Sequence, residues 1–440
     1  MRKFSCIFIA FSLSFNGQNK EYFWHYRSPS GIENLNRKKK LLTLIMAGGR
    51  GERLYPLTKT RAKPAVSFGG DYRIIDFTLS NCFNSGFRAI YLLTQYRSMT
   101  LDRHVRLAWN LFRRELGEFI DSVPPQHLIA NKWYEGTADS VYQNIHLLDE
   151  HRPDLVLILS GDHIYKMNYG LLVEYHNEKG ADLTVATVDM PVDQSYRFGV
   201  LEMDTERRIV GFEEKPVKGK PHPDDPNKIL VNMGVYVFDT RTLVRELIED
   251  YKRGSSRDFG HDIIPQMIRK GERVFGYEFG DIEGGKSRYW RDIGDLDSYY
   301  EANMDLVKLC PDFNLYDEEW PIHTHRAQGP PAKTIDESPE RRGYATNSLL
   351  STGVIISGAS VERSILSHHV HIEGGTHINE SILMPGVRVG EGCQLHRTII
   401  DEGVIIPPGK EIGRNPESDT RFFQISPQGV VIVPSGLILD

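Results

Sequence analysis

Cysteine is scarce in this sequence. Its 440 residues include four cysteines, Cys6, Cys82, Cys310 and Cys393. They lie far apart and form no CxxC pair, which argues against a disulfide framework and against a structural zinc site. A reducing compartment fits this usage best, so we expect a cytoplasmic protein.

An excess of positive charge is also missing. The formal net charge is −6 at pH 7, whereas proteins that bind nucleic acid carry basic patches, so we expect no nucleic-acid partner. A small anionic ligand needs only a local cluster of cations, which the net charge does not exclude. The hydrophobic content of 40% and the charged content of 25% are those of an ordinary globular chain. The length suffices for two or three domains.

The N-terminal segment, residues 1–40, resembles a targeting signal in part. The stretch "MRKFSCIFIAFSLSFNG" has two basic residues followed by a short apolar run. No clear small-residue cleavage site follows, and the run is too short to span a bilayer. We therefore favour a disordered extension over an export signal, and we expect no membrane partner.

Short apolar runs of strand length alternate with helical patterns between residues 41 and 310. The runs are "LLTLIM" (41–46), "AIYLLT" (89–94), "DLVLIL" (154–159) and "DLTVAT" (182–187). Helical spacing is seen between them, for example at Val141, Ile145 and Leu148, with Thr137 expected to cap that helix. This alternation predicts an α/β domain around a mostly parallel sheet.

A proline-rich stretch without periodicity, residues 311–345, is interpreted as a linker, and a repeat follows it over 346–440. Four apolar registers and one glycine register recur there every 17 positions. They are Ile355/Ile372/Val389/Ile406, Val361/Ile378/Leu395/Ile412, Ile365/Ile382/Ile399, Val370/Val387/Val404 and Gly358/Gly375/Gly392/Gly409. Stacked apolar rungs with glycine at the corners predict a parallel β-helix. A sandwich of regular hairpins is the alternative, but it would not need identical registers.

A glycine-rich loop follows the first predicted strand. It contains Gly48, Gly49 and Gly51. The loop has neither the GK[ST] of a Walker loop nor a full GxGxxG, so on its own it fits a plain turn as well as a ligand loop. Four cations then follow within eleven positions: Arg53, Lys59, Arg61 and Lys63. Fixed cations beside a glycine-rich loop favour the polyphosphate of a nucleotide.

Carboxylates follow other predicted strands. Asp162 comes just after "LVLILSG", and the carboxyl ends of parallel strands meet at one edge of a sheet, so Asp162 should lie near the glycine-rich loop. A carboxylate beside a triphosphate indicates Mg²⁺, although a turn or helix-cap role is the alternative. Asp295 is expected to cap a helix, which leaves Asp292 as a second metal ligand. Glu214, next to Lys215 at another strand end, can accept hydrogen bonds from sugar hydroxyls.

Several motifs in a fixed order resemble one enzyme family. "IMAGGRGERLYPLTKTRAKPAV" is similar to the signature of the sugar-nucleotide pyrophosphorylases. "WYEGTADSVYQN", "SGDHIYKM", "EEKP" and "YWRDIG" narrow the resemblance to bacterial ADP-glucose pyrophosphorylase (glucose-1-phosphate adenylyltransferase), from about Leu41 to the C-terminus. The resemblance implies a Rossmann-like catalytic domain over 41–310 and a left-handed β-helix over 346–440. The implied reaction joins ATP and glucose 1-phosphate into ADP-glucose and pyrophosphate, for glycogen synthesis.

The resemblance also assigns roles to individual residues. The catalytic set would be Arg53, Lys63 and Asp162. The nucleotide would lie against Gly48, Gly49, Gly51 and Arg53. Mg²⁺ would be held by Asp162 and Asp292. Glucose 1-phosphate and ADP-glucose would contact Tyr134, Gly199, Glu214, Lys215 and Asn232. A homotetramer is implied, with metabolite effectors bound near Lys59, Arg61 and Arg73.

The implied chemistry needs no activated side-chain nucleophile. The attacking group is a phosphate oxygen of glucose 1-phosphate, and a phosphate monoester with a second pKa of about 6 is mostly dianionic at neutral pH. What the reaction requires is two anions held in line at the α-phosphorus, which calls for cations, a metal and positioning.

Two positions depart from the family pattern, and several alternatives stay open. Many relatives have serine at Asn232, and enteric members have lysine at Thr60, which leaves the activator undefined. One alternative is a pyrophosphorylase for another nucleotide-sugar, such as UDP-glucose. Another is a non-catalytic regulatory subunit, although such a paralogue should have lost its charged site residues. A third is an acyltransferase site in the β-helix, near His368, His369, His371 and His377.

Overall fold

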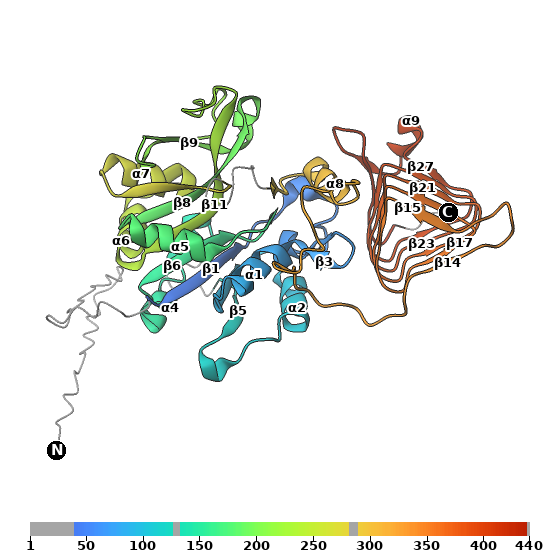
Figure 1. Cartoon of the computed structure of the whole chain (residues 1–440), viewed down its shortest axis with the longest axis horizontal. Helices are drawn as coiled ribbons and strands as arrows, with labels where there is room; N and C mark the ends of the chain where they lie inside the picture. The colour runs from blue at the N-terminus through green and yellow to red at the C-terminus, as the bar shows by residue number, and fades with distance from the viewer. Residues whose placement is uncertain (1–38, 126–132, 281–288, 438–440) are drawn as a thin grey trace, which may run out of the picture. The chain divides into compact units, whose positions relative to one another are not determined.

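The computed structural model describes residues 39–125, 133–280 and 289–437. The expectation of a disordered extension over residues 1–40 therefore lies almost wholly outside the described residues. Two regions follow each other along the chain, an α/β domain and a stack of short parallel strands (Figure 1). Within the described ranges, no helix is both long and apolar enough to cross a membrane. Cys82, Cys310 and Cys393 are free thiols there.

A nine-stranded mixed sheet forms the centre of the α/β domain. Its strands are β1 (Leu41–Ala47), β4 (Ala89–Thr94), β5 (Phe119–Val123), β6 (Leu155–Ser160), β8 (Leu183–Pro191), β9 (Gly199–Met203), β10 (Ile209–Glu214), β11 (Lys228–Asp239) and β12 (Val274–Glu278). The order is β10-β9-β11-β6-β1-β4-β5, and β8 pairs with both β11 and β12. Strands β6, β1, β4 and β5 are parallel neighbours, as the sequence predicts, whereas β11 runs antiparallel to β6, β8 and β9.

Helices cover both faces of this sheet, because alternate residues of its buried strands point to opposite sides. On one face, Ile45 of β1 shares a core with α1 (Ile74–Asn84), α2 (Ser98–Ala108) and α5 (Tyr169–Glu178). On the other face, Leu44 shares a core with the remaining layer of helices. These are α3 (Thr137–Tyr142), α4 (His146–His151), α6 (Thr240–Arg253) and α7 (Ile264–Arg269). Figure 1 shows the resulting layers.

Short elements complete the α/β domain. They are β2 (Ser67–Phe68), β3 (Tyr72–Arg73), β7 (His163–Tyr165), β13 (Trp290–Asp292), α8 (Leu296–Asp305), the 3₁₀ helices η1 (Glu52–Leu54), η2 (Lys63–Ala65), η3 (Arg114–Leu116) and η4 (Val192–Arg197), and the π-helical turn η5 (Phe259–Ile263). Asp295 is the N-cap of α8 and accepts a hydrogen bond from Ser298 N at 2.8 Å, which confirms the predicted cap.

The predicted capping role of Thr137 is wrong. The residue before α3 is Gly136, and Thr137 is the first residue of the helix. Its hydroxyl instead donates to Asp258 Oδ2 at 2.9 Å and accepts from Phe259 N at 3.0 Å. A tertiary contact with the segment leading into η5 thus takes the oxygen that a cap would use. The single helix predicted through Val141 and Leu148 is divided into α3 and α4.

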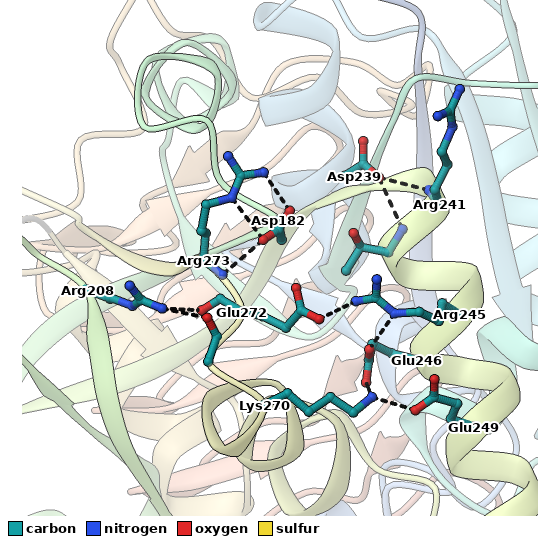
Figure 2. A network of polar contacts seen from close by, with 12 residues as sticks. Asp182, Arg208, Asp239, Arg241, Arg245, Glu246, Glu249, Lys270, Glu272 and Arg273 are labelled. Atoms are coloured by element: carbon teal, nitrogen blue, oxygen red, sulfur yellow. Dashed lines mark hydrogen bonds and ion pairs between the residues drawn. The ribbon is translucent and has the colours of Figure 1, made fainter. Parts of the chain in front are cut away.

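A polar network ties α6 to the loop between α7 and β12 and to Asp182, just before β8 (Figure 2). The carboxylate of Glu246 is almost fully buried and accepts hydrogen bonds from Arg245 Nε at 3.0 Å and Lys270 Nζ at 2.6 Å. Arg273 donates two side-chain hydrogen bonds to the Asp182 carboxylate, from Nε at 3.1 Å and from Nη2 at 2.8 Å. Paired in this way, the charges fasten the helices to the sheet edge without leaving an unpaired buried group.

The C-terminal region consists of three sheets of short strands. The first contains β14 (Lys333–Ile335), β17 (Ile355–Ser357), β20 (His371–Ile372), β23 (Arg388–Val389) and β26 (Ile405–Ile406). The second contains β15 (Tyr344–Thr346), β18 (Ser360–Glu362), β21 (His377–Asn379), β24 (Gln394–His396) and β27 (Glu411–Ile412). The third contains β16 (Leu349–Leu350), β19 (Ile365–Leu366), β22 (Ile382–Leu383), β25 (Thr398–Ile400), β29 (Val431–Val433) and β28 (Gln424–Ile425). The short helix α9 (Pro416–Asp419) precedes β28.

Successive coils pair in parallel, and this arrangement fits a left-handed β-helix. The rung Val361, Ile378, Leu395 and Ile412 pairs in the predicted register and is buried. The four corner glycines of the fifth register all have positive φ, between 51° and 72°. The predicted register that begins with Ile355 and Ile372 is wrong at its first member, because Ile372 pairs with Ile356 and not with Ile355. That first step is shorter by one residue, and Ile356 points into the core while Ile355 is half-buried.

The predicted linker, 311–345, contains two strands of the β-helix. Strand β14 pairs with β17 and β15 pairs with β18, so the stacked sheets begin at Lys333.

The outer side of the third sheet packs on the α/β domain. Ile365, Ile382 and Ile399 share one core with Phe77 of α1 and Tyr299 of α8. The two regions are therefore joined by apolar packing as well as by chain connection.

Candidate active site

The glycine-rich loop leaves the end of β1 and folds back on the segment that carries Lys63. Gly51 has φ +65°, and a Cβ atom there would lie 2.9 Å from Lys63 Cβ. The Thr58 hydroxyl donates to Gly51 O at 2.9 Å and closes the loop. A Cβ at Gly49 would meet no atom within 4 Å, so the backbone there is open to an approaching ligand. Glycine is required at position 51 for close packing, and at Gly49 it leaves room for a ligand.

Parallel pairing of β1 and β6 places Asp162 beside this loop. Met46 pairs with Ser160, and Gly161 N donates to Met46 O at 3.1 Å. Both strands therefore end at the same edge of the sheet, which is where ligands bind in open α/β sheets. Asp162 follows Ser160 by two residues and accepts a hydrogen bond from the Ser160 hydroxyl at 2.5 Å.

Lys63 and two aspartates converge at this edge. Lys63 Nζ lies 2.5 Å from Asp162 Oδ2 and 3.9 Å from Asp292 Oδ1. The Lys63 side chain is 10% exposed, so the ammonium group is held in place and weakly screened. Burial by itself would raise the pKa of the Asp162 carboxyl, but the neighbouring Lys63 and His163 and the hydrogen bond from Ser160 hold that pKa well below its usual range. Asp162 is therefore an anion at every physiological pH.

Arg53 reaches the same place from η1. A Cβ atom at Gly294 would lie 3.3 Å from Asp292 Oδ2 and 3.6 Å from a guanidinium nitrogen of Arg53. Gly294 thus sits between the arginine and the aspartate. Arg53, Lys63, Asp162 and Asp292, four of the residues singled out from the sequence, surround one exposed edge of the sheet.

His163 is a further member of this group, and sequence reasoning missed it. Strand β7 pairs with β13 so that His163 lies opposite Asp292. One donor atom from each of Asp162, His163 and Asp292 lies within 4.8 Å of the others, which is a spacing that could hold a metal ion. Carboxylate oxygens are the ligands that Mg²⁺ prefers, so the residues present fit a divalent cation. The signal was available in "SGDHIY", where the histidine directly follows Asp162.

A second group lies at the ends of β9 and β10. Lys215 Nζ pairs with Glu214 Oε1 at 3.0 Å, and the Lys215 side chain is 57% exposed. A Cβ atom at Gly199 would lie 2.7 Å from Glu214 Oε2 and 2.6 Å from Phe212 Cζ. Gly199 is therefore glycine because the Glu214 carboxylate and the Phe212 ring occupy the space of a side chain. The accessible ammonium and carboxylate can both contact a ligand.

Asn232 connects this second group to the edge that carries Asp162 and His163. A register shift in β11 between Asn232 and Tyr236 accompanies a hydrogen bond of 2.7 Å from Asn232 Nδ2 to the Tyr236 hydroxyl. Burial raises the pKa of Tyr236, and the nearby Asp258 and Glu214 carboxylates act in the same direction. Asn232 Oδ1 accepts from Gly234 N at 2.9 Å. A Cβ at Gly234 would lie 3.3 Å from His163 Cε1, which brings β11 against the edge that carries Asp162 and His163.

Tyr134 lies on the side of the glycine-rich loop. Its backbone N–H donates to Gln95 Oε1 at 2.6 Å, and its hydroxyl accepts from Asn144 Nδ2 at 2.9 Å. Gln95 in turn approaches Gly48, where a Cβ atom would lie 3.1 Å from Gln95 Cβ. The described contacts thus associate Tyr134 with Gly48. Sequence reasoning missed Gln95, whose signal is its position directly after the strand "AIYLLT".

Two of the three residues predicted to bind effectors, Arg61 and Arg73, lie elsewhere, between the α/β domain and the β-helix. Arg61 Nη1 is 2.8 Å from Asp401 Oδ1 and 3.5 Å from Glu402 Oε1. Arg73 Nη1 is 2.5 Å from Glu402 Oε1. Lys59 is exposed. Both guanidinium groups are thus engaged by carboxylates of the β-helix, and effector binding at these residues stays a prediction.

Comparison with known proteins gives two family matches. Residues 42–308 match the nucleotidyl transferase family, and residues 330–433 match the GlmU-like C-terminal hexapeptide family. Both spans agree with the two regions of the fold. The hexapeptide match begins before Lys333, where the stacked sheets start.

Curated relatives align with most of the chain. A glucose-1-phosphate adenylyltransferase of Methylococcus capsulatus is 48% identical over 90% of this chain and 93% of its own length. Glucose-1-phosphate adenylyltransferase 2 of Vibrio parahaemolyticus is 50% identical over 89% of this chain and 98% of its own length. A glucose-1-phosphate adenylyltransferase of Rhodopirellula baltica is 48% identical over 90% of each chain.

Proposed function

This chain belongs to the glucose-1-phosphate adenylyltransferases of the nucleotidyl transferase family, and we propose that its active-site edge joins ATP and glucose 1-phosphate into ADP-glucose and pyrophosphate. The single observation that carries the residue assignments is the convergence of Lys63 with Asp162 and Asp292 at the carboxyl ends of the strands. Arg53 adds a second cation there.

The reaction is an in-line displacement at phosphorus. A phosphate oxygen of glucose 1-phosphate forms a bond to the α-phosphorus of ATP, and the bond from that phosphorus to the bridging oxygen of the β-phosphate breaks. Pyrophosphate leaves with the electron pair. Because the attacking phosphate monoester is already mostly dianionic at neutral pH, no side chain has to remove a proton. The protein's contribution is to hold two mutually repelling anions together and to stabilise the charge that develops.

Lys63 and Arg53 are the cations that meet the triphosphate. The Lys63 ammonium is buried and fixed by Asp162, so it loses little freedom when a phosphate oxygen accepts a hydrogen bond from one of its remaining protons. The Arg53 guanidinium can contact two phosphate oxygens at once. The open backbone at Gly49 lets the nucleotide approach the loop, and Gly48 with Tyr134 and Gln95 forms the adjacent wall.

Asp162 and Asp292 are the residues that would hold Mg²⁺. A bound divalent cation would neutralise charge on the phosphates. Lys63 and Ser160 lower the pKa of Asp162, so its carboxylate is ionised and can bind a cation at neutral pH. We propose Mg²⁺ as that cation.

Glucose 1-phosphate is assigned to the group around Lys215. Its exposed ammonium is suited to the sugar phosphate, and the Glu214 carboxylate beside it can accept hydrogen bonds from two sugar hydroxyls. Gly199 leaves the space in which Glu214 lies. The Asn232 amide, which is bonded to Tyr236 and Gly234, orients the wall of this subsite.

The wider setting follows the family and is also proposed. We assign the protein to the cytoplasm and to glycogen synthesis, as a homotetramer with metabolite effectors near Lys59, Arg61 and Arg73. The free thiols at Cys82 and Cys393 agree with a reducing compartment.

Pyrophosphate release with ATP and with UTP, each with glucose 1-phosphate, tests the proposal. We expect turnover with ATP to exceed turnover with UTP by at least about tenfold, a ratio that corresponds to about 1.4 kcal/mol of discrimination. A preference for UTP would instead identify a UDP-glucose pyrophosphorylase. Binding of ATP without release of pyrophosphate would identify a non-catalytic regulatory subunit.

A further inference from the structure

His163 is a buried histidine that lacks the hydrogen bonds such a residue normally makes. Its side chain is 10% exposed, and its ring packs edge-to-face on Trp290, with centroids 5.1 Å apart. Nδ1 is buried and has no hydrogen-bond partner among the described residues. Nε2 points between two carboxylates, 3.5 Å from Asp162 Oδ1 and 3.6 Å from Asp292 Oδ1. Leaving a buried polar group unbonded is costly, so this arrangement needs an explanation.

Two other buried or half-buried histidines of this chain make direct bonds. His176 Nδ1 lies 2.9 Å from Thr184 Oγ1, and His104 Nε2 lies 2.7 Å from Asp76 Oδ1. His146 Nδ1, like His163 Nδ1, is buried without a hydrogen-bond partner among the described residues, but Nε2 of His163 also lies beside two carboxylates, at distances longer than a good hydrogen bond. Nε2 thus lies near both carboxylate oxygens without a close hydrogen bond to either.

The two distances from Nε2 suit a small cation shared by the imidazole and the two carboxylates, whose ligand atoms all lie within 4.8 Å of one another. Oxygen and nitrogen ligands lie about 2.1 Å from a first-row divalent ion, which puts neighbouring ligand atoms roughly 3.0–3.5 Å apart. The separations from Nε2 are 3.5 Å, at the upper end of that range, and 3.6 Å, just above it. The pairing of β7 with β13 sets His163 opposite Asp292, so two adjacent strands and not a loose loop position these ligands.

We propose that His163 Nε2 is a third, nitrogen ligand of the divalent ion held by Asp162 and Asp292, and that it favours Mn²⁺ over Mg²⁺ at this site. This inference rests on the proposed metal-binding role of the two aspartates. Mg²⁺ strongly prefers oxygen ligands and gives up water reluctantly, whereas a transition-metal ion accepts an imidazole nitrogen more readily. The two aspartates could hold a cation without His163. Its imidazole thus determines which metal the site prefers.

Electron paramagnetic resonance with Mn²⁺ and no nucleotide tests the proposal directly. On the full-length wild-type protein, spin-echo modulation should contain coupling to ¹⁴N, and labelling with ¹⁵N-histidine should change that pattern. In His163→Gln the nitrogen coupling should disappear and the Kd for Mn²⁺ should rise by about tenfold or more. The Kd for Mg²⁺, measured by competition, should rise by a smaller factor. His371→Gln, on β20 of the β-helix, is the matched control and should leave both unchanged.

The nitrogen coupling and the two metal affinities separate the alternatives. If Mn²⁺ bound to the wild-type protein shows no nitrogen signal that changes on histidine labelling, the inference is wrong. This measurement does not depend on whether a variant folds. Equal loss of Mn²⁺ and Mg²⁺ affinity in a His163→Gln protein with an unchanged melting temperature also overturns it, because the histidine would then only orient the carboxylates. Formation of ADP-glucose is scored separately. A protein that binds Mn²⁺ through nitrogen but makes no ADP-glucose rejects the proposed function alone, and an active enzyme without nitrogen coupling rejects this inference alone.

Discussion

Lys63 Nζ lies 2.5 Å from Asp162 Oδ2, although the two residues are 99 positions apart in the sequence. The contact joins the 3₁₀ helix η2 to the loop after β6, and the parallel pairing of β1 with β6 makes it possible. A buried ammonium with a carboxylate partner is stable, while a phosphate oxygen can still approach its remaining protons. This pair is the centre of the proposed site.

Replacing Lys63 should abolish most of the activity. In Lys63→Met we expect kcat for pyrophosphate release to fall by about 10²–10³, the usual loss when one preorganised charge donor is removed. Lys252→Met is the control, because that lysine is exposed on α6. A stopped pyrophosphate assay measures both. A Lys63→Met enzyme within tenfold of the wild-type kcat would contradict the role.

Replacing Lys215 should affect the sugar phosphate alone. Lys215→Gln removes an accessible charge, and charged hydrogen bonds contribute about 1.5–3 kcal/mol, so KM for glucose 1-phosphate should rise by about 10–100-fold. KM for ATP should stay within twofold. Lys218→Gln, three residues further along and also exposed, is the matched control. A parallel rise in the KM for ATP would mean that Lys215 contacts the nucleotide.

The Arg61–Asp401 pair should stabilise the junction between the two regions. The side chains are 6% and 2% exposed, so Asp401→Leu leaves an arginine buried with a weaker partner and should cost about 3–5 kcal/mol in unfolding free energy. The double variant Arg61→Met/Asp401→Leu should lose less than the sum of the single losses. The exposed pair Arg363–Glu380 provides a control cycle, expected to give less than about 1 kcal/mol. Additive losses at Arg61 and Asp401 would contradict the coupling.

Stability should fall in mild acid because of His176. Burial lowers the pKa of His176 from 6.5 to about 4, with a smaller contribution from Lys39. The unfolded chain therefore takes up the proton first, so this contribution is complete above about pH 6.5 and is lost as the pH falls toward 4. The total loss is about 3 kcal/mol. In His176→Gln, chemical denaturation at several pH values should show a smaller pH slope than the wild type, and an identical slope would refute the assignment.

Two glycines of the β-helix should respond differently to alanine. Gly392 has φ +70°, and a Cβ atom there would meet no atom within 4 Å, so Gly392→Ala should cost only about 1–2 kcal/mol of backbone strain. At Gly413, with φ +84°, a Cβ atom would lie 1.7 Å from the carbonyl oxygen of His396. Gly413→Ala should therefore lose several kcal/mol more, as measured by urea denaturation. Equal losses would mean that the coil can shift to admit the methyl group.

Local patterns in the sequence were sufficient for the elements and for part of the site. The buried strands and the 17-residue repeat are visible because apolar side chains must recur with the period of the structure that buries them. Gly48 and Asp162 could be assigned to one edge because parallel neighbouring strands end together. The helix cap at Asp295 depends on residues three positions apart, and short-range signals of that kind survive in any sequence window.

Other features were decided by contacts between distant segments. Thr137 looked like a cap, but Asp258 and Phe259, more than a hundred residues away, take its hydroxyl. Ile356 and not Ile355 enters the rung, because the first coil is one residue shorter than the repeat. His163 became part of the site only when β13 brought Asp292 beside it.

The sequence by itself thus determined the strands, the coils and most of the charged residues available for chemistry. The tertiary structure alone decided which of those charges meet. Arg53 and Lys63 lie beside Asp162 and Asp292, while Arg61, two residues before Lys63, pairs with Asp401 across 340 positions of chain. The physical reason is that a charged side chain pairs with whichever group the folded chain brings within a few ångströms. Spacing along the sequence does not specify that group.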